Sequence, residues 1–483
     1  MNSESNSFLL MTHGTYSDVM AWRHGAPITV RQFLSDVARL AAALPAGRHL
    51  LNACADRYRF TVGLAAALLT SRISLLPPSQ SAETVRQMKV FAPDAFCLVD
   101  GPSSIDLPIF WFDDAHFPLA AGGEDAGAKD AEAGDAGAHD AAADGVPTGV
   151  PSIPADRTLA IVFTSGSTGA PLPHRKSWGA LVRDVRAEAA ALALPAGAAP
   201  QVVGTVPPQH MYGIESTVLL PLQTGGALCA DHPFYPADIC AALAGLPRPR
   251  MLVTTPVHLR ALLDAGVDIP AIDLLLSATA PLSEALAANA ETRLGAPLQE
   301  IYGATETGQI ATRRSTHTRY WSLLPGITLE ERSGICWASG GHIDRETPLG
   351  DRLELAPSGS FLLHGRIGDL VNVAGKRNSL AYLNHQLLAI DGVEDGVFFM
   401  PANELVDGVT RLAAFAVAPG LSVAAVRAAL RKLIDPIFMP RPLVLLERLP
   451  RNSTGKVTRE TIETLVLTHL KPDAAQARQP DEA

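Results

Sequence analysis

The sequence contains little cysteine, and its cysteines show no pattern. Five occur among 483 residues, an odd number without paired spacing. This argues against a disulfide framework and against a zinc site, and it favours a reducing compartment. The five are Cys54, Cys97, Cys229, Cys240 and Cys336.

Basic stripes and long apolar runs are also missing. The net charge is −10 at pH 7 and no basic stripe is present, so nucleic acid is not an expected partner. The longest apolar stretch, residues 60–69, is too short to span a bilayer. The N-terminus lacks a basic segment followed by a long apolar run, so no secretory signal is expected. These absences predict a cytoplasmic protein.

Apolar residues, by contrast, are plentiful. They make up 47% of the chain, enough for a large core without covalent cross-links. At about 100–200 residues per domain, the length predicts two or three domains. Short apolar runs predict strands at 158–163, 251–256 and 273–279, and helical patterns occupy 28–44 and 178–194. This alternation predicts an α/β fold with ligands at the carboxyl ends of strands.

Two segments differ from this pattern. Residues 120–150 are rich in Ala, Gly and Asp and have no aromatic residue, so we predict a disordered insertion. Near the C-terminus, strands are predicted at 396–401 and 411–419 and helices at 423–434 and 459–470. This set is typical of a small α+β domain, with a boundary in 364–372, where glycines let the backbone bend.

A short stretch of small residues, TSGSTG (164–169), has the composition of an anion-binding loop. It holds two glycines and four hydroxyl residues between a predicted strand and a predicted helix. Glycines let the backbone approach an anion, and N–H groups and hydroxyls supply donors. Taken alone, the stretch fits a phosphate site and an ordinary strand-to-helix turn equally well.

Four later stretches carry side chains that suit a nucleotide. IYGATETG (301–308) offers Thr305 and Glu306, and a carboxylate near phosphates most often serves Mg²⁺. Asp351 precedes a predicted strand, where its carboxylate can accept from both hydroxyls of a ribose. Arg366 is a planar donor suited to phosphate or ribose, and Lys456 lies in a glycine-led turn. Each has an ordinary alternative: a solvated carboxylate, a turn-capping Asp, a surface ion pair or an exposed lysine.

Together, in this order and spacing, the five stretches resemble the adenylate-forming superfamily. That group contains acyl- and aryl-CoA synthetases, the adenylation domains of peptide synthetases and firefly luciferase. The resemblance covers nearly the whole chain, from about residue 20 to residue 470. It implies an α/β fold with a large, multi-sheet N-terminal AMP-binding domain (1–366). It also implies a small, mobile α+β C-terminal lid domain (367–483) that carries the catalytic lysine.

The resemblance also implies a role for each matching residue. Thr305 would contact phosphate, Glu306 would bind Mg²⁺, and Lys456 would reach the substrate carboxylate and the α-phosphate as the third catalytic residue. The hinge would be Gly368 and Asp369. The acyl pocket would be lined by His210, Tyr212, Gly213 and Ser277. ATP or AMP would be contacted by Thr164, Ser165, Gly166, Ser167, Thr168, Gly169, Lys176, Ala278, Thr279, Tyr302, Gly303, Asp351 and Arg366.

The chain departs from the family pattern in three places. The hinge position holds Gly368, and the stretch 375–384 has Tyr382 and Asn384 where a glutamate is usual. The phosphate loop usually runs TGxPKG, but here Leu172 and Pro173 replace its Lys and Gly. Either the site is weakened, or Arg175 and Lys176 supply the charge from the first turn of the following helix. We favour the second interpretation, because the other catalytic residues are all present.

The function implied is ATP-dependent, AMP-forming activation of a carboxylic acid, followed by thioester formation with coenzyme A. The expected cofactors are ATP, Mg²⁺ and coenzyme A, or the phosphopantetheine of a carrier protein acting in trans, since no carrier domain follows residue 470. His210 and Tyr212 suit an aromatic or short polar acid. Two alternatives are a non-catalytic nucleotide-binding member of the family, which Leu172 motivates, and a luciferase-like oxygenase, to which no other feature points.

Overall fold

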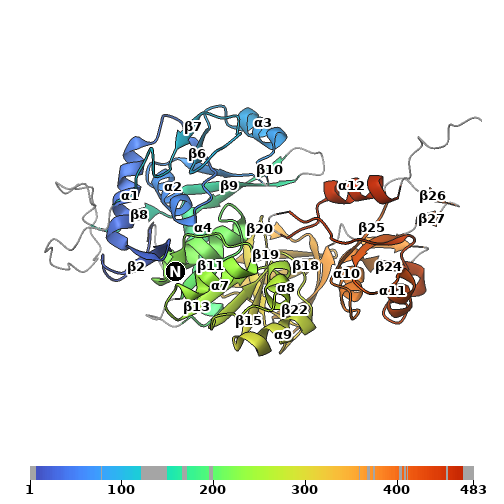
Figure 1. Cartoon of the computed structure of the whole chain (residues 1–483). Coiled ribbons are helices and arrows are strands. Elements are labelled where there is room, and N and C mark those ends of the chain that lie inside the picture. Colours follow the sequence, from blue (N-terminus) through green and yellow to red (C-terminus); the bar gives the residue numbers. More distant parts are fainter. Residues whose placement is uncertain are drawn as a thin grey trace, which may run out of the picture. The chain divides into compact units, whose positions relative to one another are not determined.

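The structure is a computed structural model of the chain (Figure 1). It describes residues 7–77, 79–120, 149–165, 171–194, 200–357, 359–366, 370–373, 376–401, 405–406, 409–410, 412–452 and 455–470. The chain separates into two compact units. The N-terminal unit comprises Met1–Ala278, Leu286–Glu330 and Trp337–Pro348, and the C-terminal unit comprises Thr279–Ala285, Glu331–Cys336 and Leu349–Ala483.

One sheet of the N-terminal unit has six strands in the order β10-β9-β5-β4-β6-β7. Its members are β4 (His49–Asn52), β5 (Ile73–Leu76), β6 (Phe96–Val99), β7 (Ile109–Trp111), β9 (Thr158–Ser165) and β10 (Pro171–Ser177). All neighbours are parallel except β9 and β10, which pair antiparallel. One edge of this sheet is therefore β10, the second strand of the β9–β10 hairpin.

The second sheet runs, within the N-terminal unit, in the order β17-β16-β15-β14-β13-β11-β12-β2-β3. The strands from β15 to β2 in this order are parallel, so their carboxyl ends meet at one edge. The members are β2 (Val19–Arg23), β3 (Ala26–Thr29), β11 (Gln201–Gly204), β12 (Ala227–Cys229), β13 (Arg250–Thr254), β14 (Leu274–Ser277), β15 (Leu298–Ala304), β16 (Gly308–Arg313) and β17 (Trp321–Leu323).

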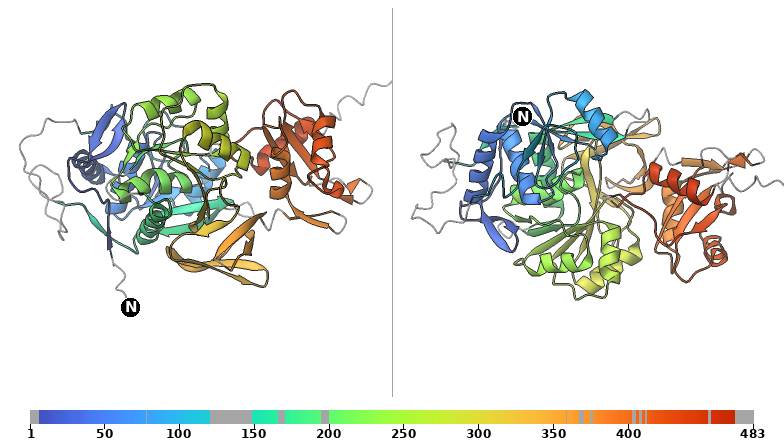
Figure 2. Two further views of the ribbon diagram at one scale, coloured as in Figure 1. Left: turned by 90° about the horizontal axis from the view of Figure 1, so that it is seen from below. Right: turned by 45° about the horizontal axis from the view of Figure 1, so that its top comes forward.

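The crossovers between these strands are helical. Helices α7 (Pro236–Ala244), α8 (Pro256–Asp264) and α9 (Glu284–Leu294) lie along one side of the second sheet (Figure 2). The others are α1 (Val30–Ala43), α2 (Arg57–Leu69), α3 (Ala82–Phe91), α4 (Trp178–Ala191), α5 (Met211–Gly213), the π-helix η1 (Ile214–Leu219) and α6 (Leu220–Thr224). Two short strands, β1 (Ser7–Leu9) and β8 (Ser152–Pro154), pair with each other. The remaining strands are β18 (Ile327–Arg332), β19 (Ile335–Gly340) and β20 (Ile343–Pro348).

Local sequence explains where the main helices begin. Thr29 caps α1 in a capping box with Gln32, and Ser177 caps α4 by accepting from the Ala180 amide. Phe33 and Val37 of α1 and Trp178 of α4 are buried in the core that the helices share with the strands. The helices are thus fixed by their caps and by one apolar face.

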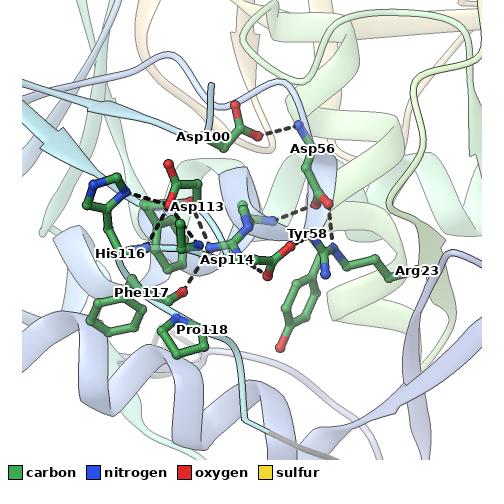
Figure 3. A network of polar contacts seen from close by, with 12 residues as sticks. Arg23, Asp56, Tyr58, Asp100, Asp113, Asp114, His116, Phe117 and Pro118 are labelled. Carbon is green, nitrogen blue, oxygen red and sulfur yellow. Dashed lines mark hydrogen bonds and ion pairs between the residues drawn. The ribbon is translucent and has the colours of Figure 1, made fainter. Parts of the chain in front are cut away.

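Pairs of arginine and aspartate tie α2 to the loops around it (Figure 3). The Asp56 carboxylate accepts from Arg23 Nε at 2.7 Å, and the Asp56 amide donates to Asp100 at 2.7 Å. Arg59 pairs with Asp114 and donates to the carbonyl of Phe112. These bonds hold the chain that leads into the region predicted as an insertion.

The C-terminal unit has its own apolar cores. Its main sheet has the order β25-β28-β29, from β25 (Asp395–Phe399), β28 (Ala413–Val417) and β29 (Leu443–Leu445). Leu383, Leu387, Phe398, Val426 and Leu430 belong to one core cluster. The other elements are β21 (Asp351–Leu355), β22 (Ser360–Arg366), β23 (Leu370–Val373), β24 (Lys376–Ser379), β26 (Leu405–Val406), β27 (Val409–Thr410), α10 (Leu380–Leu388), α11 (Val423–Leu430), the 3₁₀ helix η3 (Pro436–Phe438) and α12 (Arg459–His469).

The α/β fold class is confirmed, and the expected strands and helices are present within a few residues of their predicted bounds. One expectation is wrong: residues 171–177 are not the entry to a helix but strand β10. The domain boundary at 366/367 stays a prediction; the unit division assigns β21 and β22 to the C-terminal unit. The predicted insertion falls mostly outside the described residues. None of the helices in the described ranges is both long and apolar enough to cross a bilayer.

Candidate active site

The stretch predicted to bind phosphate joins two strands of a hairpin. Thr164 lies near the end of β9 and its Oγ1 is 2.9 Å from Nε2 of His174 on β10. Ser165 ends β9, while the predicted contacts Gly166, Ser167, Thr168 and Gly169 lie outside the described residues. Leu172, at the place of the usual lysine, is 52% exposed.

The second predicted motif is the turn between β15 and β16, and the hairpin lies against it. The Glu306 side chain is 40% exposed, and its Oε1 is 3.8 Å from His174 Nε2. Burial lowers the pKa of His174, and the nearby Glu306 carboxylate opposes that shift. The structure thus brings Thr164, His174 and Glu306 together from segments more than a hundred residues apart.

An exposed carboxylate on a turn fits the magnesium ion that the family resemblance implies. Mg²⁺ usually takes one or two protein carboxylates and fills its other positions with phosphate oxygens and water. Across the described ranges, no three His, Cys, Asp or Glu side chains are grouped to hold a metal ion by themselves. Glu306 is therefore suited to a metal that arrives with a nucleotide, with Thr305 beside it on the turn.

Lys176 occupies an unexpected position for a phosphate ligand. It lies on β10, is only 7% exposed, and donates from Nζ to the backbone carbonyl of Glu306 at 3.2 Å. Arg175 is exposed and donates from Nε to Thr158 Oγ1 at 2.6 Å. The two cations therefore project to opposite faces of the strand, as alternation along a strand requires.

Two of the predicted acyl-pocket residues, Tyr212 and Ser277, reach the carboxyl ends of β13 and β14. The Tyr212 hydroxyl is directed at the carbonyls of Thr254 and Leu276, 3.2 and 3.0 Å away. Ser277 is buried, and no hydrogen-bond partner reaches its Oγ among the described residues. At Gly213 a Cβ atom would lie 1.9 Å from the Pro207 carbonyl oxygen, so only glycine fits. In the predicted acyl pocket Tyr212 would therefore contribute its ring, since its hydroxyl is engaged by the backbone.

The predicted acyl-pocket residue His210 precedes α5 as its N-cap. The remaining residues of the N-terminal unit that are predicted to contact the nucleotide lie on β15 or directly after β14. Tyr302, on β15, is buried and packs with a tilted ring against Trp321, 5.7 Å between centroids. Gly303 follows it, and Ala278 comes directly after β14, whose Ser277 is paired with Glu300 of β15.

The C-terminal unit holds the other predicted residues. Asp351 and Arg366 are direct cross-strand partners at the ends of β21 and β22. Lys456 is exposed, and its turn is closed by a bond from its amide to Asn452 Oδ1 at 2.8 Å. Thr279 has a left-handed backbone with φ of 76°. The predicted hinge, Gly368 and Asp369, lies outside the described residues.

Sequence reasoning missed a group of buried polar residues beneath the Glu306 turn. Burial raises the pKa of Glu188 to about 8 and that of Glu215 to about 7, although Lys176 opposes the shift at Glu215. Burial also lowers the pKa of His342 to about 4. Period-two alternation along 171–177 would have placed His174 beside Lys176, had this segment been read as a strand. The remaining members come together only through the tertiary fold.

A family model described as an AMP-binding enzyme matches residues 14–330. The chain belongs to the AMP-binding enzyme family. Among its relatives, a 4-coumarate–CoA ligase of Rhodobacter capsulatus is 34% identical over 281 residues, 57% of this chain and 68% of that protein. A 4-coumarate–CoA ligase of Halorhodospira halophila is 33% identical over 245 residues, 50% of this chain and 59% of that protein. A 4-chlorobenzoate–CoA ligase of Arthrobacter is 24% identical over 379 residues, 68% of this chain and 70% of that protein.

Solved structures share the fold of this AMP-binding enzyme. ATP-bound MatB from Rhodopseudomonas palustris matches with a TM-score of 0.74 and 17% identity, over 93% of this chain and 96% of the other. The O-succinylbenzoate coenzyme A synthetase of Bacillus subtilis, in complex with AMP, matches with the same score and identity, over 92% and 95%. The predicted family and the class of AMP-forming acid–thiol ligase are confirmed, and the names of the relatives support an acyl- or aryl-CoA synthetase.

Proposed function

We propose that this AMP-binding enzyme activates an aryl carboxylic acid with ATP and transfers the acyl group from the adenylate to coenzyme A. One observation carries the proposal: His174 joins Thr164 of the phosphate-loop hairpin to the carboxylate of Glu306. Two motifs that sequence reasoning assigned to the phosphates and to Mg²⁺ thus face each other. The acid class is supported by the tyrosine ring at the strand ends and by the relatives named for 4-coumarate and 4-chlorobenzoate.

The chemistry follows from the charges involved. A carboxylate is a poor acyl donor, because its leaving group would be oxide. Attack of a carboxylate oxygen on the α-phosphorus of ATP forms a mixed anhydride with AMP and breaks the bond to pyrophosphate. The thiolate of coenzyme A then attacks the acyl carbon and AMP leaves. Because two anions must meet in the first step, cationic groups that face the developing charge dominate its catalysis.

Several groups of the chain serve this first step. Thr164 and the loop after it would bind the β- and γ-phosphates, and Thr305 would donate to phosphate. Glu306 would hold Mg²⁺, which neutralises phosphate charge when bound. Lys456 of the C-terminal unit would contact the carboxylate and the α-phosphate, and Asp351 and Arg366 would bind the ribose. A rotation about Gly368 and Asp369 would then admit the thiol.

The first test is acid-dependent exchange of labelled pyrophosphate into ATP. We expect exchange with aryl acids, and at least tenfold less with long-chain fatty acids. An ATP-binding chain that exchanges with no acid in a broad panel would instead be the non-catalytic family member that exposed Leu172 motivates.

The second test concerns the acceptor. The active acid is offered with coenzyme A or with a phosphopantetheinylated carrier protein, and the thioester product is measured. Turnover with coenzyme A supports the proposal, whereas turnover with the carrier protein alone assigns the chain to the carrier-dependent alternative.

A further inference from the structure

A cluster of buried polar side chains lies directly under the turn that carries Thr305 and Glu306. All of its members are less than 9% exposed, and they come from β10, α4, η1, β16 and the segment before β20. The buried polar cluster consists of Lys176, Asp184, Glu188, Glu215, Gln309 and His342. Three carboxyls and one ammonium are therefore enclosed together.

The cluster contacts the turn through the backbone. Lys176 Nζ donates to the carbonyl of Glu306 at 3.2 Å, and the amide of Gln309 donates to Asp184 Oδ2 at 3.3 Å. Gly308 has a φ of +80°, and a Cβ atom there would lie 2.4 Å from Asp184 Oδ2. The turn and the start of β16 thus contact the cluster at three residues, Glu306, Gly308 and Gln309.

The charges in the cluster depend on one another. Glu215 and Asp184 exert the two largest electrostatic effects on Lys176, and Lys176 in turn favours ionised Glu215. Burial raises the pKa of Asp184 well above its ordinary value, which favours its neutral form, and neither Asp184 Oδ1 nor Glu215 Oε1 has a hydrogen-bond partner among the described residues. A buried ion left without its counter-charge costs several kcal/mol. The Glu215 carboxylate therefore favours the ammonium of Lys176 at the place where it donates to the turn.

The turn between β15 and β16 follows an irregular part of its hairpin. Its hairpin register shifts between Tyr302 and Gly303, so the ladder of β15 and β16 is irregular just before the turn. The Glu306 side chain is 40% exposed and its carboxylate contacts His174, while its carbonyl accepts from Lys176, so both contacts of this residue come from strand β10.

We propose that Lys176 is a positioning residue for the metal-binding turn: its ammonium, facing the Glu215 carboxylate, fixes the backbone of Glu306 so that the carboxylate meets the nucleotide-bound magnesium ion. The inference rests on the proposed function, in which Glu306 holds Mg²⁺. It differs from a direct contact between Lys176 and phosphate.

The test compares Lys176→Met and Lys176→Arg with the full-length wild-type chain. Magnesium-dependent ATP binding is measured by calorimetry, ATP binding is repeated in EDTA, and amide hydrogen exchange is followed over residues 302–310. For Lys176→Met we expect the half-saturating Mg²⁺ concentration to rise about tenfold, the scale of one charge-assisted hydrogen bond. Exchange over 302–310 becomes faster, ATP affinity in EDTA stays within about twofold of wild type, and Lys176→Arg restores part of the loss.

Lys89→Met is the matched control. It also removes one lysine charge, from an exposed ion pair with Asp106 on the surface of α3, and should leave all three measurements unchanged. Wild-type magnesium dependence and exchange rates in Lys176→Met would overturn the proposal. An equal loss of ATP affinity in EDTA would also overturn it, in favour of direct phosphate contact.

Removing one charge from the cluster can unfold the chain, so a second variant is needed. Lys176→Met combined with Glu215→Gln removes the ammonium and one counter-charge together, and should fold and show the same magnesium defect. A folded double variant with wild-type magnesium dependence contradicts the proposal. If the wild-type chain exchanges pyrophosphate with no acid, the proposed function fails, while metal binding and hydrogen exchange still decide the role of Lys176.

Discussion

Glu188 shows how a single buried carboxyl couples folding to pH. It is fully buried on α4, accepts from Ser216 Oγ at 2.7 Å and from Gln309 Nε2 at 2.9 Å, and its pKa is raised to about 8 by burial. In the unfolded chain this carboxyl ionises near pH 4.5. Between these values the unfolded chain releases a proton that the folded chain keeps, so this group lowers the free energy of unfolding as pH rises.

Glu188→Gln should remove this pH-dependent loss of folding stability. At about 1.4 kcal/mol per pKa unit, the effect across the window amounts to a few kcal/mol at most. We expect the variant to match wild type near pH 5 and to have the higher Tm at pH 8.5. The check is Tm measured at pH 5, 7 and 8.5 for both proteins. Parallel Tm-against-pH curves would mean that Glu188 is ionised in the folded chain.

The residues of the candidate site divide into those that sequence could predict and those it could not. Thr164, Thr305 and Glu306 were predicted because their chemistry is concentrated in short motifs. His174 and the members of the buried polar cluster other than Lys176 were missed. Asp184, Glu215 and His342 lie outside these motifs in three different segments, and only tertiary packing makes them neighbours.

At the scale of elements, the prediction for residues 171–177, which form strand β10, was wrong. Its first three residues include Pro171 and Pro173, which sequence reasoning interpreted as a loop leading into a helix. Proline is tolerated in an edge strand, because one side of that strand makes no ladder bonds, and β10 is the edge of its sheet. The buried strands were predicted correctly, because their apolar runs signal burial directly.

Arg57 joins three elements and is the strongest candidate for a stabilising side chain. It lies at the start of α2, is fully buried, and donates to the carbonyls of Gly204, Val206, Cys229 and Asp231 at 2.7–3.0 Å. These carbonyls lie at or just beyond the ends of β11 and β12. The side chain thus satisfies four backbone acceptors, and its bonds to the carbonyls of Gly204, Val206 and Cys229 are buried.

Arg57→Met should lower the free energy of unfolding by about 3–5 kcal/mol, because several buried carbonyls lose their donor. Urea denaturation provides the measurement. The control is Arg48→Met at an exposed position, where we expect a change within about 0.5 kcal/mol. Equal denaturation midpoints for the two variants would show that water or a rearranged donor replaces the guanidinium.

At the scale of the whole molecule, the chain has two units, and the proposed chemistry uses both. Lys456 stands on a turn of the C-terminal unit that Asn452 closes through its side chain and backbone. The turn is closed by the Asn452 side chain and by backbone bonds, so truncation of the lysine side chain leaves those bonds in place.

Lys456→Ala should reduce acid-dependent pyrophosphate exchange by about 100-fold or more, the scale of one lost charge contact in a transition state. Thioester formation from a supplied acyl-adenylate and coenzyme A should fall by less than about tenfold, because the adenylation contact is no longer needed. Both half-reactions are measured beside Lys432→Ala, an exposed lysine of the same unit. Equal losses in the two half-reactions would count against the assigned role.

The buried polar cluster beneath the Glu306 turn has an evolutionary consequence. Lys176, Asp184 and Glu215 are enclosed together, so each substitution is tolerated only in the context of the others. Lineages that replace the lysine are expected to lose an acidic side chain at position 184 or 215 as well. Such paired changes leave a covariation signal between the phosphate-loop strand and the π-helix, whereas Arg175, one residue away but solvated, is free to vary alone.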